Sequence, residues 1–265
     1  MVEIICATYT MGVESHSKLN SLLQKGTPGG VFLSGWLNAS GYSDQLLKKY
    51  RDSGWLTALS KGVMYRAGDK LRSFAVLESY NSQLGKSYHI AAHSALELAG
   101  FNHYVPMGKP VLMVGHSKQE PVPQWLKKEK FDYTLKFFST ETFSEPQFTL
   151  FNPDYPHLQA SVPELAFLEC LLLAPKQYSY VDLFYIMEQL TTLRPEIVQQ
   201  LLENTDNLKV KRMFLYMAEK AGHYWFDALD TEKIELGSSK HKLVDNGVYV
   251  SKYKITLPKE LYDYE

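Results

Sequence analysis

The sequence has 265 residues, of which 45% are hydrophobic and 22% charged, enough apolar side chains for the cores of one large or two ordinary domains. Its net charge of −1 is divided unevenly, since residues 1–70 carry eight Lys or Arg against five Asp or Glu and the remainder is acidic. The two cysteines, Cys6 and Cys170, match no metal or redox spacing, which excludes those sites and predicts reduced thiols in a cytoplasmic protein.

The N-terminal segment predicts no targeting signal. Residues 1–12 are apolar but carry Glu3 and no preceding basic run, so they are a poor signal peptide and too short to span a bilayer. They are expected to be a disordered leader or an upstream start ahead of Met11. A first helix is expected from Val13 to Lys25, where Gly26 supplies a left-handed stop.

Two short helices in close succession are predicted next. Ser34 is expected to cap a helix that ends at Ser40, and Gly41 provides the stop. Ser43 is expected to cap a second helix, Ser43–Ser53, which buries leucines and a tyrosine on one face and is polar on the other. This helix-turn-helix pattern is typical of proteins that place the second helix in a DNA major groove.

A small hairpin follows the second helix. Trp55–Leu59 and Val63–Arg66 are expected to be strands on either side of a tip that contains Gly62. With the helices before it, this hairpin predicts a winged helix-turn-helix domain over residues 13–69. The glycine at the tip lets the backbone approach a phosphate closely.

A set of polar and basic side chains on the predicted helix and wing is expected to contact DNA. Gln45 lies in the first turn, where a glutamine can pair with adenine, and the cations suit phosphates or guanine. Asp44 favours the helix dipole but would repel nearby phosphates. The expected DNA-binding residues are Ser43, Gln45, Lys48, Lys49, Arg51, Lys61 and Arg66. Alternatively, these are ordinary exposed residues of a helix and a hairpin. Winged domains also dock proteins, so a protein partner is a further alternative.

Residues 70–265 are expected to form one larger α+β domain, so the fold class is α+β. Helices are predicted at Ser73–Leu84, Ala91–Ala99, Pro163–Leu173, Val181–Leu190, Pro195–Leu202 and Val210–Ala221, and strands at Val111–Val114, Tyr133–Phe138 and Tyr253–Leu257. Asp245-Asn246-Gly247 predicts a hairpin turn.

Three cations crowd the first turn of one of these helices. Lys209, Lys211 and Arg212 oppose the helix dipole, which would suit a surface that contacts an anion or an acidic partner. The alternative is a solvated helix start balanced by Glu203 and Asp206.

No pattern supports catalysis, a metal or a cofactor. His89, His93 and Glu97 would share a face if their helix reached back to His89, but the general-base glutamate of a zinc protease motif is missing. Gly115-His116-Ser117 lacks the closing glycine of a nucleophile elbow. We therefore expect no catalytic residues, no metal site and no cofactor.

Several short runs occur along the chain in a fixed order: Ser53-Gly54-Trp55-Leu56, Ser161-Val162-Pro163-Glu164, Leu193-Arg194-Pro195, Lys209-Val210-Lys211-Arg212-Met213-Phe214-Leu215 and Lys252-Tyr253-Lys254-Ile255-Thr256. In this order they resemble the AbiEi family of antitoxins from type IV toxin–antitoxin systems. Asp44 and His241 depart from the family's pattern, which more often has a basic residue at both positions.

The resemblance implies a transcriptional repressor of its own operon that binds repeats in promoter DNA. It also implies that the C-terminal domain counters a nucleotidyltransferase-type toxin without forming a stable complex with it. Neither an enzymatic activity nor a membrane partner is implied. The alternative is a protein-interaction module whose winged domain docks a partner protein.

Overall fold

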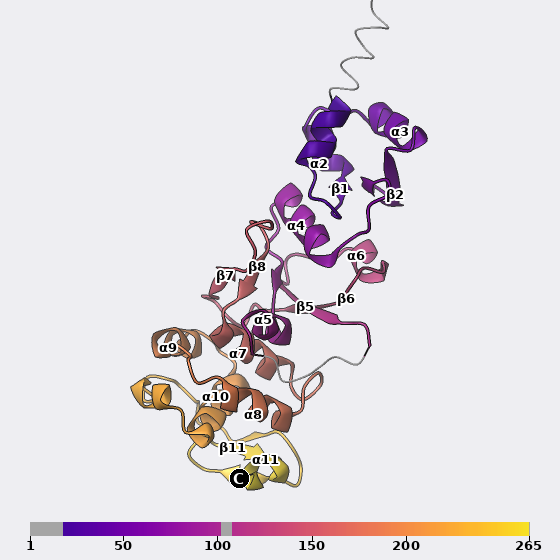
Figure 1. The fold of residues 1–265 in the computed structure, drawn as a ribbon. Coiled ribbons are helices and arrows are strands. Elements are labelled where there is room, and N and C mark those ends of the chain that lie inside the picture. The colour runs from indigo at the N-terminus through magenta and orange to yellow at the C-terminus, as the bar shows by residue number, and fades with distance from the viewer. Residues whose placement is uncertain (1–17, 102–107, 265) are drawn as a thin grey trace, which may run out of the picture. The chain divides into compact units, whose positions relative to one another are not determined.

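The structure is a computed structural model that describes residues 18–101 and 108–264. The predicted leader and the first residues of the predicted first helix lie outside these ranges. The chain folds into two compact units. Unit 1 comprises the chain up to Ser87 together with Val122–Thr134 and Asp154–Leu158, and unit 2 comprises Tyr88–Pro121, Leu135–Pro153 and the chain from Gln159 onward. Figure 1 shows the elements along the chain.

Unit 1 begins with a winged helix-turn-helix, as predicted. Its elements are a helix over residues 18–25, β1 (Phe32–Leu33), α2 (Ser34–Ala39), α3 (Asp44–Asp52), β2 (Leu56–Ser60) and β3 (Val63–Arg66). The strands form one sheet in the order β1-β3-β2, and every pair is antiparallel. The register of β2 against β3 shifts between Ala58 and Ser60 near the hairpin tip.

The predicted caps of the two helices are borne out at α3 and not at α2. The Ser43 side chain accepts a hydrogen bond from the Leu46 backbone N–H, which caps α3 as expected. Ser34 is instead the first helical residue of α2, and the capping position belongs to Leu33 with no side-chain bond. The Ser34 backbone N–H is used by the wing, because it donates to the Gly62 carbonyl oxygen over 2.9 Å.

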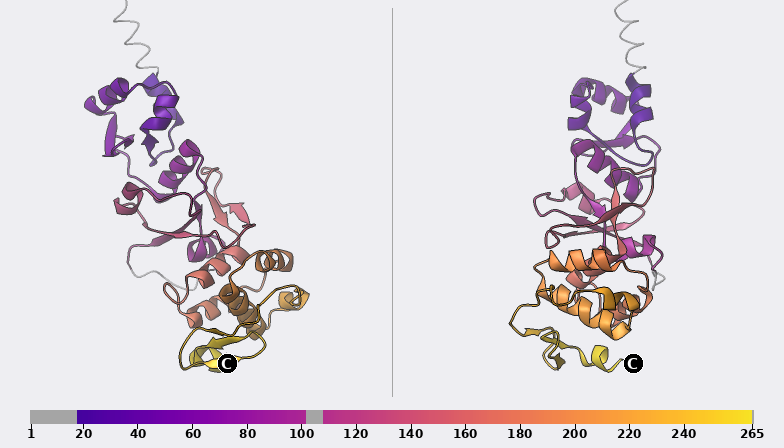
Figure 2. Two further views of the ribbon diagram at one scale, coloured as in Figure 1. Left: turned by 180° about the vertical axis from the view of Figure 1, so that it is seen from behind. Right: turned by 90° about the vertical axis from the view of Figure 1, so that its left-hand side faces the viewer.

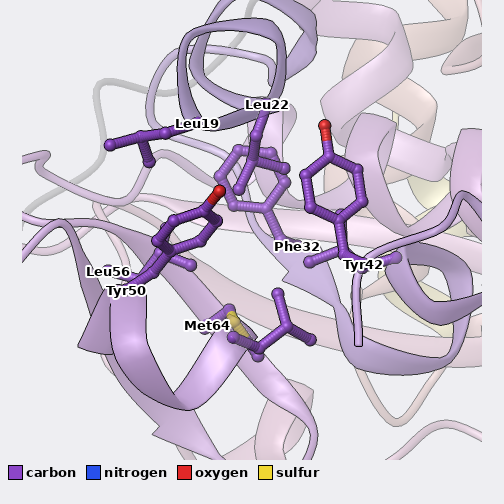
Figure 3. Packing of buried hydrophobic residues seen from close by; sticks show 9 residues of the cluster. Leu19, Leu22, Phe32, Tyr42, Tyr50, Leu56 and Met64 are labelled. Atoms are coloured by element: carbon purple, nitrogen blue, oxygen red, sulfur yellow. The ribbon is translucent and has the colours of Figure 1, made fainter. Parts of the chain in front are cut away.

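One apolar core joins the helices to the sheet of the winged domain. Leu19 and Leu22 from helix 18–25, Phe32 from β1, Tyr50 from α3 and Met64 from β3 are all buried and converge in Figure 3. Leu37 of α2 and Leu56 of β2 belong to the same core. Burial of the Leu47 and Tyr50 face fixes the orientation of α3.

Unit 1 continues beyond the winged domain into α4 (Ser73–Leu84) and α6 (Gln124–Lys128). The α4 helix ends where Gly85 adopts a left-handed conformation with φ of 60°. It supports β1 through two polar side chains. Gln83 accepts from the Leu33 N–H at 2.8 Å and donates to the Val31 carbonyl at 2.6 Å, while the Ser79 hydroxyl accepts from the Val31 N–H.

Two later segments of the chain are bound to α4. Asp132 accepts hydrogen bonds from the Ser73 backbone N–H and hydroxyl at 2.7 and 2.6 Å, at the start of the helix. The buried carboxylate of Glu78 accepts from the His157 backbone N–H at 2.8 Å, and its other oxygen lies 2.6 Å from the His157 ring. These bonds explain why segments distant in sequence belong to unit 1.

Unit 2 contains a five-stranded mixed sheet in the order β6-β5-β4-β8-β7. Its strands are β4 (His89–Ile90), β5 (Val111–His116), β6 (Thr134–Ser139), β7 (Phe148–Leu150) and β8 (Gln159–Ser161), and α5 (Ala92–Leu98) follows β4. Gly115 is required in β5, because a Cβ atom there would lie 2.2 Å from the His89 ring on the neighbouring strand. Sequence analysis identified β5 and β6 but not the three shorter strands.

After α5, the helices of unit 2 are α7 (Pro163–Leu173), α8 (Tyr180–Gln189), α9 (Pro195–Glu203), α10 (Leu208–Ala221), the 3-10 helix η1 (Tyr224–Ala228) and α11 (Lys259–Asp263). The α7 helix is apolar except for its two glutamates and is nearly all buried. The α7 helix contacts α5, α8, α9 and α10. As expected, Met213, Phe214 and Met217 of α10 belong to this core.

A small sheet near the C-terminus corrects one sequence prediction. Its strands are β9 (His241–Lys242), β10 (Val248–Val250) and β11 (Ile255–Leu257), in the order β10-β11-β9. The Asp245-Asn246-Gly247 turn therefore does not close a hairpin, since β11 lies between the strands on either side of it. The hairpin is formed by β10 and β11, which pair antiparallel.

Within the described ranges, no helix has both the length and the apolar composition needed to cross a bilayer.

Candidate nucleic-acid interface

The α3 helix presents a continuous polar face to solvent. Gln45, Lys48 and Lys49 are exposed, while Leu47 and Tyr50 on the opposite side are buried. At 3.6 residues per turn this spacing places the three polar side chains on the side away from the core. Among the described residues none of the three forms an ion pair, so their donors are available to a ligand.

The acidic residue at the start of α3 is already hydrogen bonded. The Asp44 carboxylate accepts from the Asn38 side-chain amide of α2 at 3.1 Å. It also lies in the first turn, where a negative charge is favoured by the helix dipole. This contact joins α2 to α3 across the turn and gives Asp44 a structural role.

A groove of about 480 Å³ separates α3 from the wing. Asp44 and Arg51 line it from α3, and Ser60 and Lys61 line it from the hairpin. Arg51 is half-buried and Lys61, at the tip, is exposed. Gly62 follows the tip with a φ of 74°, a conformation that a side chain would strain. The structure thus brings Arg51 of the helix and Lys61 of the wing to the same groove.

Arg66 was predicted to bind DNA with the exposed cations of α3 and the wing, but its guanidinium is engaged elsewhere. Its guanidinium donates to the carbonyl oxygens of Leu23 and Gly26, at the C-terminal end of helix 18–25. Carbonyls at this end of a helix lack partners within the helix, so a cation there is favourable. Arg66 therefore positions helix 18–25 against β3.

The structure corrects the expected cationic surface on α10. Arg212 is fully buried and donates to the carbonyl oxygens of Leu236, Ser239 and Lys254. Lys211 is also buried. Arg212 thus ties α10 to the C-terminal segments, and neither the anion-contact surface nor the solvated helix start predicted for these residues is observed.

Lys209 has a structural role as well. Its ammonium group donates to the carbonyl oxygens of Leu172 and Ala174 at 3.0 and 2.7 Å, at the end of α7. Burial, followed by repulsion from Lys176, lowers the pKa of Lys209 from its ordinary value. A sequence pattern cannot reveal these acceptors, because they lie more than 30 residues away in the chain.

The histidine pattern noted in the sequence separates into two contacts. His89 lies in β4 and not in the following helix, and its ring is 3.3 Å from the buried carboxylate of Glu169. His93 lies in α5, with its ring 2.6 Å from the Tyr178 hydroxyl. Among the described residues, no three His, Cys, Asp or Glu side chains form a group that could hold a metal ion.

The residues of α4 that position the interface were not predicted from the sequence. Ser79 and Gln83 hold the residues leading into α2 by the bonds described above, and so fix the first helix of the helix-turn-helix. The only signal in the sequence was a run of polar side chains within an otherwise buried helix. Their partners, about 50 residues earlier in the chain, could not be read from it.

The fold of unit 1 and the exposed second helix beside a β-hairpin define a winged helix-turn-helix protein, which is joined here to a larger α+β unit. Comparison with known families agrees with this class. The model described as "Transcriptional regulator, AbiEi antitoxin N-terminal domain" matches residues 15–107. The model described as "Transcriptional regulator, AbiEi antitoxin, Type IV TA system" matches residues 109–258. The chain therefore belongs to the AbiEi family of transcriptional regulators, the antitoxins of type IV toxin–antitoxin systems.

A solved structure shares the fold. The crystal structure of the RV2827C protein from Mycobacterium tuberculosis is similar with a TM-score of 0.55 and 15% sequence identity, over 80% of this chain and 78% of that one. No curated protein matches the sequence.

Proposed function

We propose that this antitoxin binds double-stranded DNA in its own promoter through α3 and the wing, and thereby represses its operon. The observation that carries the proposal is the exposed polar face of α3, which bears Lys48 and Lys49 and adjoins a groove shared with the tip of the wing. A helix of this kind fits the major groove, where side chains in its first turn reach base edges.

Each side chain has a role that follows from its position. Gln45 in the first turn is placed to read a base, and Lys48 and Lys49 to contact phosphates or guanine. Arg51 and Lys61 would hold the backbone at the groove between helix and wing. Ser43, whose oxygen already caps α3, can still donate its hydroxyl proton to a phosphate.

The test is a gel shift on the DNA immediately upstream of the gene, at two fixed salt concentrations. The variant Gln45→Ala/Lys48→Ala/Lys49→Ala should lose specific binding, because it removes one base contact and two cations without exposing the core. The matched control is Gln119→Ala/Lys118→Ala/Lys259→Ala, which makes the same exchanges at exposed positions of unit 2. Equal affinities for the two variants would refute the assignment of α3.

We further propose that the antitoxin counters a nucleotidyltransferase-type toxin in the cytoplasm, and that it does so independently of DNA binding. Since the two units alternate along the chain, the full-length protein is the appropriate reagent. The α3 triple variant should still rescue growth of cells that express the toxin encoded beside it. Failure to rescue, with the variant present at the level of the native protein, would tie neutralisation to repression.

A second candidate function is docking of a partner protein by the wing. Trp55 at the base of the hairpin is 48% exposed, and large exposed aromatic side chains are common at protein interfaces. Co-purification of the toxin at fixed stoichiometry, lost in Trp55→Ala and accompanied by no DNA affinity, would favour this alternative.

A further inference from the structure

The two lysines of α6 and Lys130 just beyond its end, with Glu129 between them in sequence, form a second cationic patch on unit 1, called here the α6 patch. Lys127, Lys128 and Lys130 are all exposed, and among the described residues none of them forms an ion pair. They belong to unit 1 although they come more than 50 residues after the winged domain in sequence. This α6 patch is therefore a feature that the fold adds to the DNA-binding unit.

The α6 patch is anchored on unit 1 by the residues around it. Leu126 and Phe131, on either side of the lysines, are buried, and Trp125 meets the Tyr80 ring of α4 edge-on at 6.0 Å. Asp132 binds the start of α4 through the hydrogen bonds described above. Since α4 in turn holds β1, the patch and the winged domain are fixed to the same helix.

The α6 helix lies on the same side of unit 1 as α3 and β2 in the ribbon views of Figure 1 and, from behind, of Figure 2. The described residues of unit 1 contain 13 Lys and Arg against seven Asp and Glu, a formal charge of +6. Unit 1 is thus strongly cationic, and the α6 patch continues its exposed cations beyond the wing.

We propose that the α6 patch binds the phosphate backbone of the duplex beyond the sequence read by α3, and so extends the operator footprint on one flank. This inference rests on the proposed function. Duplex DNA carries about one negative charge per 1.7 Å of its axis, so a duplex that continues past the wing presents phosphates to cations placed further along the same side. Lysine contacts of this kind strengthen and orient binding without reading sequence.

The test compares the native protein with Lys127→Gln/Lys128→Gln/Lys130→Gln on the same upstream DNA. Each lost phosphate contact reduces the slope of log K against log salt concentration by about 0.9, so the loss of three reduces it by about 2.7 and weakens binding by about tenfold or more at 0.1 M salt. Hydroxyl-radical footprinting should show lost protection at one flank, with protection of the α3 site retained.

Two further proteins make the result specific. Lys118→Gln/Lys176→Gln/Lys259→Gln removes the same charge from exposed sites of unit 2 and should bind like the native protein. Lys127→Arg/Lys128→Arg/Lys130→Arg keeps the cations and should restore both the salt slope and the flank. Circular dichroism should show the native fold in all variants, because every exchanged side chain is exposed.

The possible failures are distinguishable. If the native protein binds the upstream DNA while the α6 glutamine variant keeps its affinity, salt slope and footprint, the α6 contact is overturned and the proposed function stands. If both glutamine variants weaken binding equally, the effect is one of net charge and the contact is again overturned. If the native protein leaves the upstream DNA unbound, the proposed function fails, and the α6 contact fails with it.

Discussion

Breaking the ion pair between Glu164 and Arg194 is expected to loosen the start of α7 by about 2–3 kcal/mol at pH 7. Glu164 lies in the first turn of α7 with its side chain 2% exposed, and Arg194 caps α9 with its side chain 49% exposed. The carboxylate accepts from the Arg194 backbone N–H and from two guanidinium nitrogens, all at 2.9–3.0 Å. The pair therefore joins the beginnings of two helices of unit 2.

The magnitude follows from the two side-chain bonds that Arg194→Met would remove. A hydrogen bond to a charged group contributes about 1.5–3 kcal/mol. The sum must be reduced, because solvent screens the half-exposed guanidinium and because the backbone N–H still binds the carboxylate. The remaining cost is mainly that of a buried carboxylate with too few donors.

The pH dependence has a definite sign. Burial alone would raise the pKa of Glu164, but the hydrogen bonds from Arg194 outweigh it and hold the pKa below its ordinary value. In the native protein this contribution is present above the unfolded-state pKa and is lost as the pH falls through the lower folded value. In Arg194→Met burial prevails and the pKa rises, so the variant should recover stability relative to the native protein as the pH falls from 7 toward 5.

Hydrogen exchange of the α7 amides, followed by mass spectrometry and corrected for intrinsic rates, measures this local stability. Glu164→Gln and the double variant complete a double-mutant cycle, whose coupling energy should be at least about 1 kcal/mol. The reasoning is refuted if Arg194→Met loses less than about 0.5 kcal/mol at pH 7, or if its loss grows on acidification.

Three other predictions concern single side chains. Arg66→Met should lower the stability of unit 1 by about 1–2 kcal/mol in thermal unfolding, because it removes the donor to two helix-end carbonyls, while DNA affinity measured well below the transition stays near native. A loss of DNA affinity without a loss of stability would show that Arg66 contacts DNA. Burial, then repulsion from Lys136, lowers the pKa of His93 from 6.5 to about 4. As the pH falls, His93 is therefore protonated in the unfolded chain before it is protonated in the folded protein. This difference removes up to about 3 kcal/mol of stability between pH 6.5 and 4. Urea unfolding of His93→Gln should lack most of that decline, and an unchanged pH profile would contradict it. Gly115→Ala should lower the free energy of unfolding by about 1–3 kcal/mol and reduce the melting temperature, because the new Cβ meets the His89 ring. An unshifted melting curve would show that β4 and β5 can move apart at this position.

The sequence predicts helices well where local signals are strong. The bounds of α4 and α7 agree with prediction because Gly85 ends one and Pro163 begins the other, and both signals act within a turn of the helix. The two helices and the hairpin of the winged domain are also predictable, because serine, glycine and apolar residues mark them. The strand β1 has only two residues and was not predicted. The strands β4, β7 and β8 have two or three residues each, too few to show a period.

The fate of the polar side chains depends on contacts that the sequence does not display. The exposed face of α3 could be predicted, because its apolar residues fill only one side of the helix. On α10 the same reasoning misplaces Lys211 and Arg212, since a helix buried on most sides gives its cations no solvent face. Their acceptors are carbonyls from distant loops, which no helical pattern encodes. The placement of α6 on unit 1 is equally non-local.

The alternation of the two units along the chain sets an order for synthesis. Unit 1 includes Val122–Thr134 and Asp154–Leu158, so its last pieces leave the ribosome long after α2 and α3. Until then α4 lacks two of its hydrogen-bonding partners, because Asp132 is not yet available to Ser73 and His157 is not yet available to Glu78. A nascent chain should therefore complete the fold of unit 1 only after more than half of the polypeptide has been translated.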